Sequence, residues 1–208
     1  MPKPQVIIFF SCFVAAMQVF AASATQTHVD QLKATTTDVL DAIYADSAQP
    51  LSKKEKQARV RAVLEKNYDL DVIIRRAIGR NWRQLDSSQQ EKVLELVKQL
   101  VIKTYVDNMN GRERPEVRFG EAIQISDKRM EVPSTVTSEG TSISVLYRLG
   151  RLRSGWQIYD VVAENISVVA NFRQQIDDHF RKGSAEALIT RLEELLNKEE
   201  IANETLQL

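Results

Sequence analysis

The chain has 208 residues, with 28 basic and 28 acidic side chains and no net charge at pH 7. Nucleic-acid-binding proteins usually carry a basic excess or a basic stripe, and electrostatic docking on anionic membranes uses polybasic segments. Neither feature is present, so we expect no nucleic-acid partner; the partner is either a neutral or apolar ligand or another protein docked through local patches.

The N-terminus is typical of a secretory signal peptide over residues 1–24. Lys3 supplies a basic start, residues 6–20 form an apolar core, and an Ala-Ser-Ala run ending at Ala24 fits a small-x-small cleavage site. The apolar run is too short for a membrane span of about 20 residues. Cleavage after Ala24 removes Cys12, the only cysteine, and so excludes disulfides and thiolate chemistry from the mature chain.

Four helices are predicted in the first half of the chain, from apolar positions at helical spacing and from capping residues. Asp69 is expected to cap the third and Gly79 to end it, and Asp86 with Gln89 forms an N-cap pair for the fourth. The expected ranges are about 28–46, 53–67, 69–79 and 86–110.

The fourth predicted helix has an unusually wide apolar face. One stripe contains Val93, Val97 and Leu100, and a second is added by Val101 and Tyr105. A surface helix needs one apolar face, so the wider face predicts burial on more than one side.

The apolar period then changes to two, which predicts antiparallel strands near 116–126, 128–137, 141–152 and 156–163. Because proline cannot donate a ladder hydrogen bond, Pro133 predicts that the second of these is an edge strand or a bulged one.

Two helices are expected to close the chain, the first ending at Gly183 and the second capped by Ser184, with a loose tail over 201–208. This order predicts an α+β fold, a curved antiparallel sheet of about four strands covered by N-terminal and C-terminal helices, with an apolar cavity between them. Residues 25–200 would form one domain, or two lobes at 28–110 and 115–197.

The search for catalytic groups is mostly negative, and we expect no catalytic residue, no cofactor and no metal. The strongest candidate is Asp160 beside Tyr159, because burial can raise the pKa of a carboxyl enough for proton transfer. The structural alternative is that Asp160 accepts backbone hydrogen bonds or pairs with an arginine at the end of its strand, and we favour this interpretation.

Several motifs resemble the MlaC (toluene-tolerance) family. The C-terminal block reads GWQIYDV over 155–161 and ISVVANFRQQ over 166–175, and a second block reads YDLDVIIRRAIGRNW over 68–82. Three positions depart from the family pattern: Asn165 stands where glycine is usual, Tyr68 where phenylalanine is usual, and Ile74 near a position that is often small or polar. Asparagine tolerates left-handed backbone better than most residues, so the junction at Asn165 can be preserved.

This resemblance implies a periplasmic carrier of phospholipid rather than an enzyme. The oligomeric state stays open, with a monomer as the default for a shuttle. Such carriers exchange lipid with an inner-membrane ABC transporter complex bearing a lipid-binding ring and with an outer-membrane lipoprotein–porin complex. They thereby maintain the lipid asymmetry of the outer membrane.

With the resemblance, the excess apolar surface becomes a candidate lipid pocket, although each of its residues can equally be ordinary core. Arg148 and Arg173 are candidates for contact with the head group. The candidate lining residues are Ile74, Ile78, Val97, Leu100, Val101, Tyr105, Val145, Tyr147, Ile158 and Phe172.

Two alternatives remain open from the sequence. A carrier with the same fold could hold another lipid, such as a hopanoid. An NTF2-like enzyme could use Asp160 on a small apolar substrate in a cone-shaped cavity.

Overall fold

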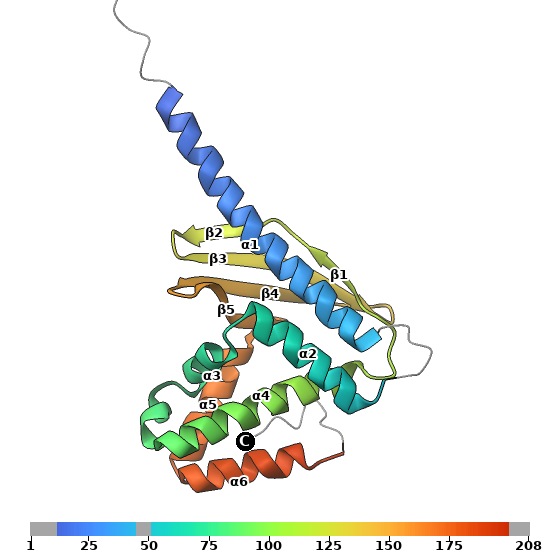
Figure 1. Ribbon diagram of the computed structural model, residues 1–208, viewed down its shortest axis with the longest axis vertical. Helices are drawn as coiled ribbons and strands as arrows, with labels where there is room; N and C mark the ends of the chain where they lie inside the picture. The colour runs from blue at the N-terminus through green and yellow to red at the C-terminus, as the bar shows by residue number, and fades with distance from the viewer. Residues whose placement is uncertain (1–11, 45–50, 200–208) are drawn as a thin grey trace, which may run out of the picture.

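The computed structural model describes residues 12–44 and 51–199, with the side chains of 26–44 and 51–199 (Figure 1). The helices are α1 (Cys12–Tyr44), α2 (Lys53–Asn67), α3 (Leu70–Ile78), the 3-10 helix η1 (Gly79–Gln84), α4 (Ser87–Met109), α5 (Val168–Phe180) and α6 (Ala185–Leu196). The strands are β1 (Glu116–Phe119), β2 (Ile123–Ser126), β3 (Arg129–Ser138), β4 (Thr141–Leu152), β5 (Gly155–Ala163) and β6 (Ile166–Ser167). The predicted tail, 201–208, lies outside the described residues, as do positions 1–11 of the predicted signal peptide.

The helix boundaries follow from their capping residues. The side chain of Asp86 accepts from the Gln89 amide at the start of α4, and Gln89 bonds back to the Asp86 backbone, as the sequence predicts. Ser184 caps α6 through a single bond, in which its side chain accepts from the Ala187 amide. Helix α3 ends at Gly79. Its φ of 63° is positive, and glycine adopts such a value at little steric cost because it has no Cβ.

The antiparallel sheet confirms the predicted α+β class but has six strands rather than about four. Its order is β1-β3-β4-β5-β6, and β2 also pairs with β3. The first predicted strand, 116–126, is divided into β1 and β2, which follow one another along the same edge of β3. The two-residue β6 was not predicted.

Pro133 predicted an edge strand or a bulged one, and the edge-strand alternative was wrong. Strand β3 is interior, with β1 and β2 on one side and β4 on the other. The Pro133 carbonyl accepts from the Gly120 amide at 2.8 Å, in the break between β1 and β2. Since the N–H and C=O of one strand residue point to the same side, the missing donor of Pro133 faces this break, and no ladder bond to β4 is lost.

The turn between β5 and β6 preserves the backbone that the family pattern requires. Glu164 has φ 47° and Asn165 has φ 65°, both left-handed. Asn165 therefore replaces the usual glycine with the residue type that best tolerates this region.

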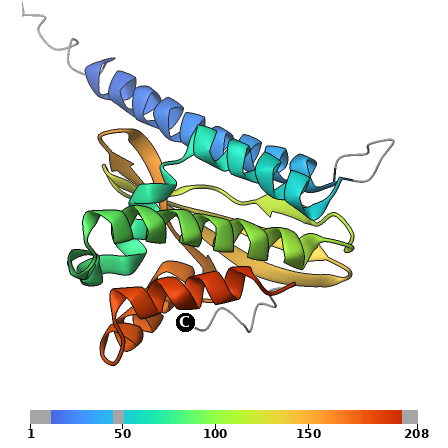
Figure 2. The same cartoon turned by 60° about the horizontal axis from the view of Figure 1, so that its bottom comes forward.

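Three clusters of buried side chains hold the helices and the sheet together. Helix α1 lies along the sheet, where Val29 and Leu32 contact Met130 and Leu149. Its C-terminal half packs with α2 and α4, and a larger cluster joins α3 and α4 to α5 and α6. In Figure 2 the pair α1 and α2 lies on one side of α4, and α6 lies on the other. Among the described helices, none combines the length and apolar content that crossing a bilayer requires.

The position of Pro133 can be tested by moving the proline. Pro133→Ala should change the free energy of unfolding by no more than about 1 kcal/mol, because no donor is needed there. Thr135→Pro, two residues along on the same side of β3, should cost about 2 kcal/mol or more, because it removes a bond to β1. Urea denaturation measures both, and a large loss for Pro133→Ala with a small one for Thr135→Pro would contradict the register.

Candidate apolar chamber and polar cavity

The face of the sheet that contacts α1 is built from alternating residues. In β4, Val145, Tyr147 and Leu149 share one face, and β3 supplies Val132 and Ser134 opposite them. Ile143 lies two residues before Val145 and so belongs to the same face, which we call the inner face. The period of two in the sequence predicted this face correctly.

Helix α4 presents an apolar side to the inner face of the sheet. The phenol of Tyr147 lies close enough to raise the pKa of Tyr105, adding to the larger effect of burial. Val101 is one turn before Tyr105 and Val97 one turn before Val101, so the three lie along one side of the helix. The principal backbone neighbours of α4 are α2, α3 and α6 rather than a strand.

This side of α4 is incompletely packed. Val97 is only 3% exposed, but Val101, at the next turn, is 51% exposed. On the inner face of the sheet, Ile143 is 39% exposed. Water therefore reaches apolar side chains on both surfaces, at positions where a closed core would bury them.

The ten predicted lining residues are distributed over several environments. Ile74, Ile78, Val97 and Leu100 belong to the cluster of α3–α6, against which Phe172 packs. Tyr105 packs with α1 and α2, while Tyr147 and Ile158 pack with α1 on the sheet. Val145 is buried on the inner face, and Val101 is the exposed member of the set. Contact between these ten residues and a lipid stays a prediction.

The two arginines predicted at the head group both have protein partners. Arg148 lies on the opposite face of β4 from Tyr147 and pairs with Glu131 at 3.0 Å and Asp160 at 3.1 Å. Arg173 donates to the Arg76 carbonyl near the end of α3. Their contact with a head group is untested and stays a prediction.

Asp160 is 6% exposed, and hydrogen bonds satisfy both its oxygens. One oxygen accepts from the Ser167 hydroxyl at 2.8 Å and from Arg148, and the other accepts from the Val169 amide at 3.2 Å. These bonds tie β5 to β4 and to the first turn of α5. These are the arginine and backbone contacts that the structural interpretation of Asp160 predicts.

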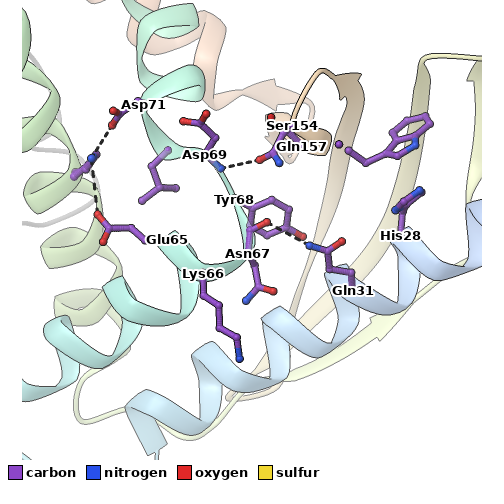
Figure 3. A pocket seen from close by; sticks show the side chains of 14 residues that line it. His28, Gln31, Glu65, Lys66, Asn67, Tyr68, Asp69, Asp71, Ser154 and Gln157 are labelled. Carbon is purple, nitrogen blue, oxygen red and sulfur yellow. Dashed lines mark hydrogen bonds and ion pairs between the residues drawn. The ribbon is translucent and has the colours of Figure 1, made fainter.

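A polar cavity of about 620 Å³ opens where α1, the α2–α3 junction and the β4–β5 turn meet (Figure 3). The Gln157 side chain accepts from the Asp69 amide at 2.7 Å, and Gln31 donates to the Asn67 carbonyl at 3.3 Å, so the walls are cross-linked. None of the ten predicted lining residues borders this cavity.

Charges of both signs line the cavity. Two lysines, Lys66 and Lys98, stand against three acidic residues, and Lys98 lies 2.6 Å from Asp71 and 3.8 Å from Glu65. Burial, and next Arg151, lower the pKa of His28, which keeps its ring neutral at pH 7. The cavity can therefore accept a group of mixed charge better than a simple anion.

Tyr68 lies at the floor of this cavity and has a buried hydroxyl group. The residue is 5% exposed and points from the α2–α3 junction toward α1 (Figure 3). Within the described part of the chain, its hydroxyl has no hydrogen-bond partner. Burial raises the pKa of Tyr68 to about 12; the neighbouring Thr35 hydroxyl opposes this shift although the pair does not have the geometry of a hydrogen bond, and the Tyr147 phenol adds to it.

Sequence reasoning missed the polar cavity, because its lining comes from four separate segments that share no periodicity. One signal was available. Tyr68 departs from the family pattern by a single hydroxyl, and a polar atom added at an otherwise apolar position requires an explanation.

The fold and the two sites define a class of small α+β proteins in which helices partly cover an apolar face of an antiparallel sheet. The profile of the MlaC protein family matches residues 33–194, most of the described chain. The chain belongs to the MlaC family, as its motifs predicted.

A solved structure shows the same fold. It is a phospholipid-binding protein from Ralstonia solanacearum in complex with a phospholipid, which aligns with a TM-score of 0.67 and 22% sequence identity. The alignment covers 80% of this chain and 95% of that one. No curated protein sequence matches the chain.

The unpaired hydroxyl of Tyr68 predicts an alkaline effect on stability. Because its pKa is raised, the folded state keeps a proton that the unfolded chain releases, so stability is full below pH 10 and is lost as the pH rises toward 12. Tyr68→Phe should reduce this slope by up to about 1.4 kcal/mol per pH unit.

The measurement is urea denaturation of lipid-free protein between pH 9 and 11.5. At pH 7 the same variant should be no less stable than the wild type, because it removes a buried polar atom without a partner. An unchanged alkaline slope would show that the hydroxyl is not buried in solution.

Proposed function

We propose that the protein is a periplasmic carrier of phospholipid, the soluble component of an ABC-type lipid transport system that maintains outer-membrane lipid asymmetry. Membership of the MlaC family and the fold shared with a phospholipid-binding protein support this proposal. The predicted signal peptide over 1–24 supports export, with the carrier acting as the chain from Thr25 onward.

The single observation that carries the proposal is that apolar side chains on α4 and on the inner face of the sheet are exposed to water. A folded domain normally buries the side chains between its helices and its sheet, yet Val101, one turn before Tyr105 on α4, and Ile143, on the inner face, remain open to water. An apolar ligand between α4 and the inner face would remove this surface from water. Val101, Tyr105, Val145 and Tyr147 border that space and are the strongest of the ten predicted lining residues. The other six act as its packed surroundings.

The energetics of a diacyl lipid require such an enclosed site. At about 0.8 kcal/mol per buried methylene, two acyl chains of roughly fifteen carbons each represent about 20 kcal/mol or more of avoided contact with water. The chains must therefore be enclosed during transit, while the head group can stay in a polar environment. Release needs no covalent step, only a partner that offers the chains another apolar path.

The charge distribution supports a shuttle rather than a membrane-bound protein. Loss of Lys3 with the signal peptide leaves 27 basic residues against 28 acidic ones, so the mature chain has about one negative charge. A protein with this balance is not held electrostatically on anionic bilayers. It can exchange lipid with an inner-membrane transporter and an outer-membrane lipoprotein–porin complex and then dissociate as a monomer.

Catalysis at Asp160 is the less favoured function. A general acid or base needs a carboxyl that reaches its substrate, but both Asp160 oxygens are engaged by Ser167, Arg148 and the Val169 amide.

The first test is native mass spectrometry with lipid extraction on the mature protein, purified without detergent from a Gram-negative host. We expect about one glycerophospholipid per protein. Detection of a bound hopanoid instead would assign the protein to a related transport system. A protein that stays empty after incubation with liposomes would contradict the carrier function.

The position of the acyl chains is tested by Val101→Asn, with Ile123→Asn as the matched control. Both residues are about half exposed, at 51% and 52%, but Ile123 pairs with Glu131 on the outer face of the sheet. An amide placed without a partner among acyl chains should lower lipid affinity about tenfold. Equal lipid loading of both variants in a liposome extraction assay would place the chains elsewhere.

A further inference from the structure

Tyr68 lies at a boundary between polar and apolar surroundings. The residue borders the polar cavity, together with Lys66, Asn67 and Gln157. Its phenol points toward α1 (Figure 3), close enough to Tyr147 on the inner face for the two to interact electrostatically. Tyr68 therefore lies between the polar cavity and Tyr147, which borders the space proposed for the acyl chains.

Three aliphatic hydroxyl groups near this boundary already have acceptors. Thr35 donates to the Gln31 carbonyl at 2.8 Å, and Thr36 donates to the Leu32 carbonyl at 2.9 Å. Ser134 donates to the Val145 carbonyl at 3.2 Å. The Tyr68 hydroxyl, in contrast, has no acceptor within the described residues. A buried donor without an acceptor is unfavourable, so this proton is available to a ligand.

Polar and apolar regions follow one another in the protein in the same sequence as along a diacyl phospholipid. The lipid runs from a charged head group through two ester groups to apolar chains. The protein runs from the mixed-charge cavity through Tyr68 to the proposed site of the acyl chains, beside the exposed Val101 and Ile143. An ester carbonyl is a hydrogen-bond acceptor that loses its water when the chains enter, and it then needs a donor.

We propose that the Tyr68 hydroxyl donates a hydrogen bond to an ester carbonyl of the bound phospholipid and thereby sets how deep the lipid lies. Tyr105 and Tyr147 border the chains just beyond this contact, and the head group lies in the polar cavity. Arg148 and Arg173 do not line this cavity, so this placement is an alternative to their predicted contact with the head group. The inference rests on the proposed carrier function and adds the part of the lipid that the protein recognises.

The test compares ester and ether lipids. Delipidated protein is incubated with liposomes that contain equal amounts of dipalmitoyl phosphatidylethanolamine and its dihexadecyl ether analogue, which lacks the ester carbonyls. Native mass spectrometry then gives the ratio of the two bound lipids. We expect the wild type to prefer the diester roughly three- to tenfold, the range of one neutral hydrogen bond.

Two variants complete the experiment. Tyr68→Phe should bring the diester-to-diether ratio close to one while still binding lipid. Tyr159→Phe is the matched control, because the Tyr159 ring lies against Arg76 at 5.3 Å, and this variant should keep the wild-type ratio. Retention of the wild-type preference in Tyr68→Phe would overturn the proposal, as would a wild type without preference.

The outcomes separate this inference from the carrier function. If neither lipid binds the wild type, the carrier function itself fails. If both lipids bind equally well to the wild type, the carrier function stands and the ester contact fails. The melting temperatures of the two lipid-free proteins give one further outcome. If the Tyr68→Phe variant melts at a lower temperature than the wild type, a buried water already accepts from the hydroxyl, and the proposal is overturned.

Discussion

Helix α4 obtains its packing from other helices, and the rest of the structure depends on this arrangement. Leu100 is buried together with Ile176, Leu188 and Leu192, so one side of α4 is fixed by the C-terminal helices. A domain that keeps apolar surface open for a ligand cannot also use that surface to stabilise itself. The cluster of α3–α6 therefore carries stability that the space under the sheet does not provide, and α4 can present Val101 and Tyr105 to that space without collapsing onto it.

Asp160 couples this helical cluster to the sheet. Its carboxylate joins Arg148 in β4 to the start of α5, and α5 in turn packs against α3. A buried carboxylate with all its bonds satisfied is directional, whereas apolar packing alone permits sliding. The direction in which α5 leaves the sheet is therefore fixed by a few polar contacts, although most of its contact area is apolar.

Local rules predicted much of the fold from sequence. The caps at Asp86 and Ser184, the exit at Gly79 and the alternation through Tyr147 depend on neighbours within a few residues, and all were correct. Pro133 was misassigned because its effect depends on a break in a different segment of the chain.

The candidate sites were harder to predict for the same reason. Periodicity indicates which side of α4 is apolar, but it cannot indicate whether a partner covers that side. Leu100 and Val101 therefore looked alike in the sequence, and only the arrangement of the helices separates buried core from exposed surface. The unpaired state of Tyr68 likewise depends on four segments meeting in space.

The break opposite Pro133 also affects how the protein behaves at high concentration. A long free strand edge can template pairing with another copy and lead to aggregation. Here the edge of β3 is covered by two four-residue pieces, β1 and β2, and the pairing of β2 contains a further irregularity. Although Ile123 and Ile125 are exposed on β2, the piece is too short and too irregular to recruit another strand. The interruption that accommodates a proline in an interior strand thus also protects the sheet from growing beyond its own edge.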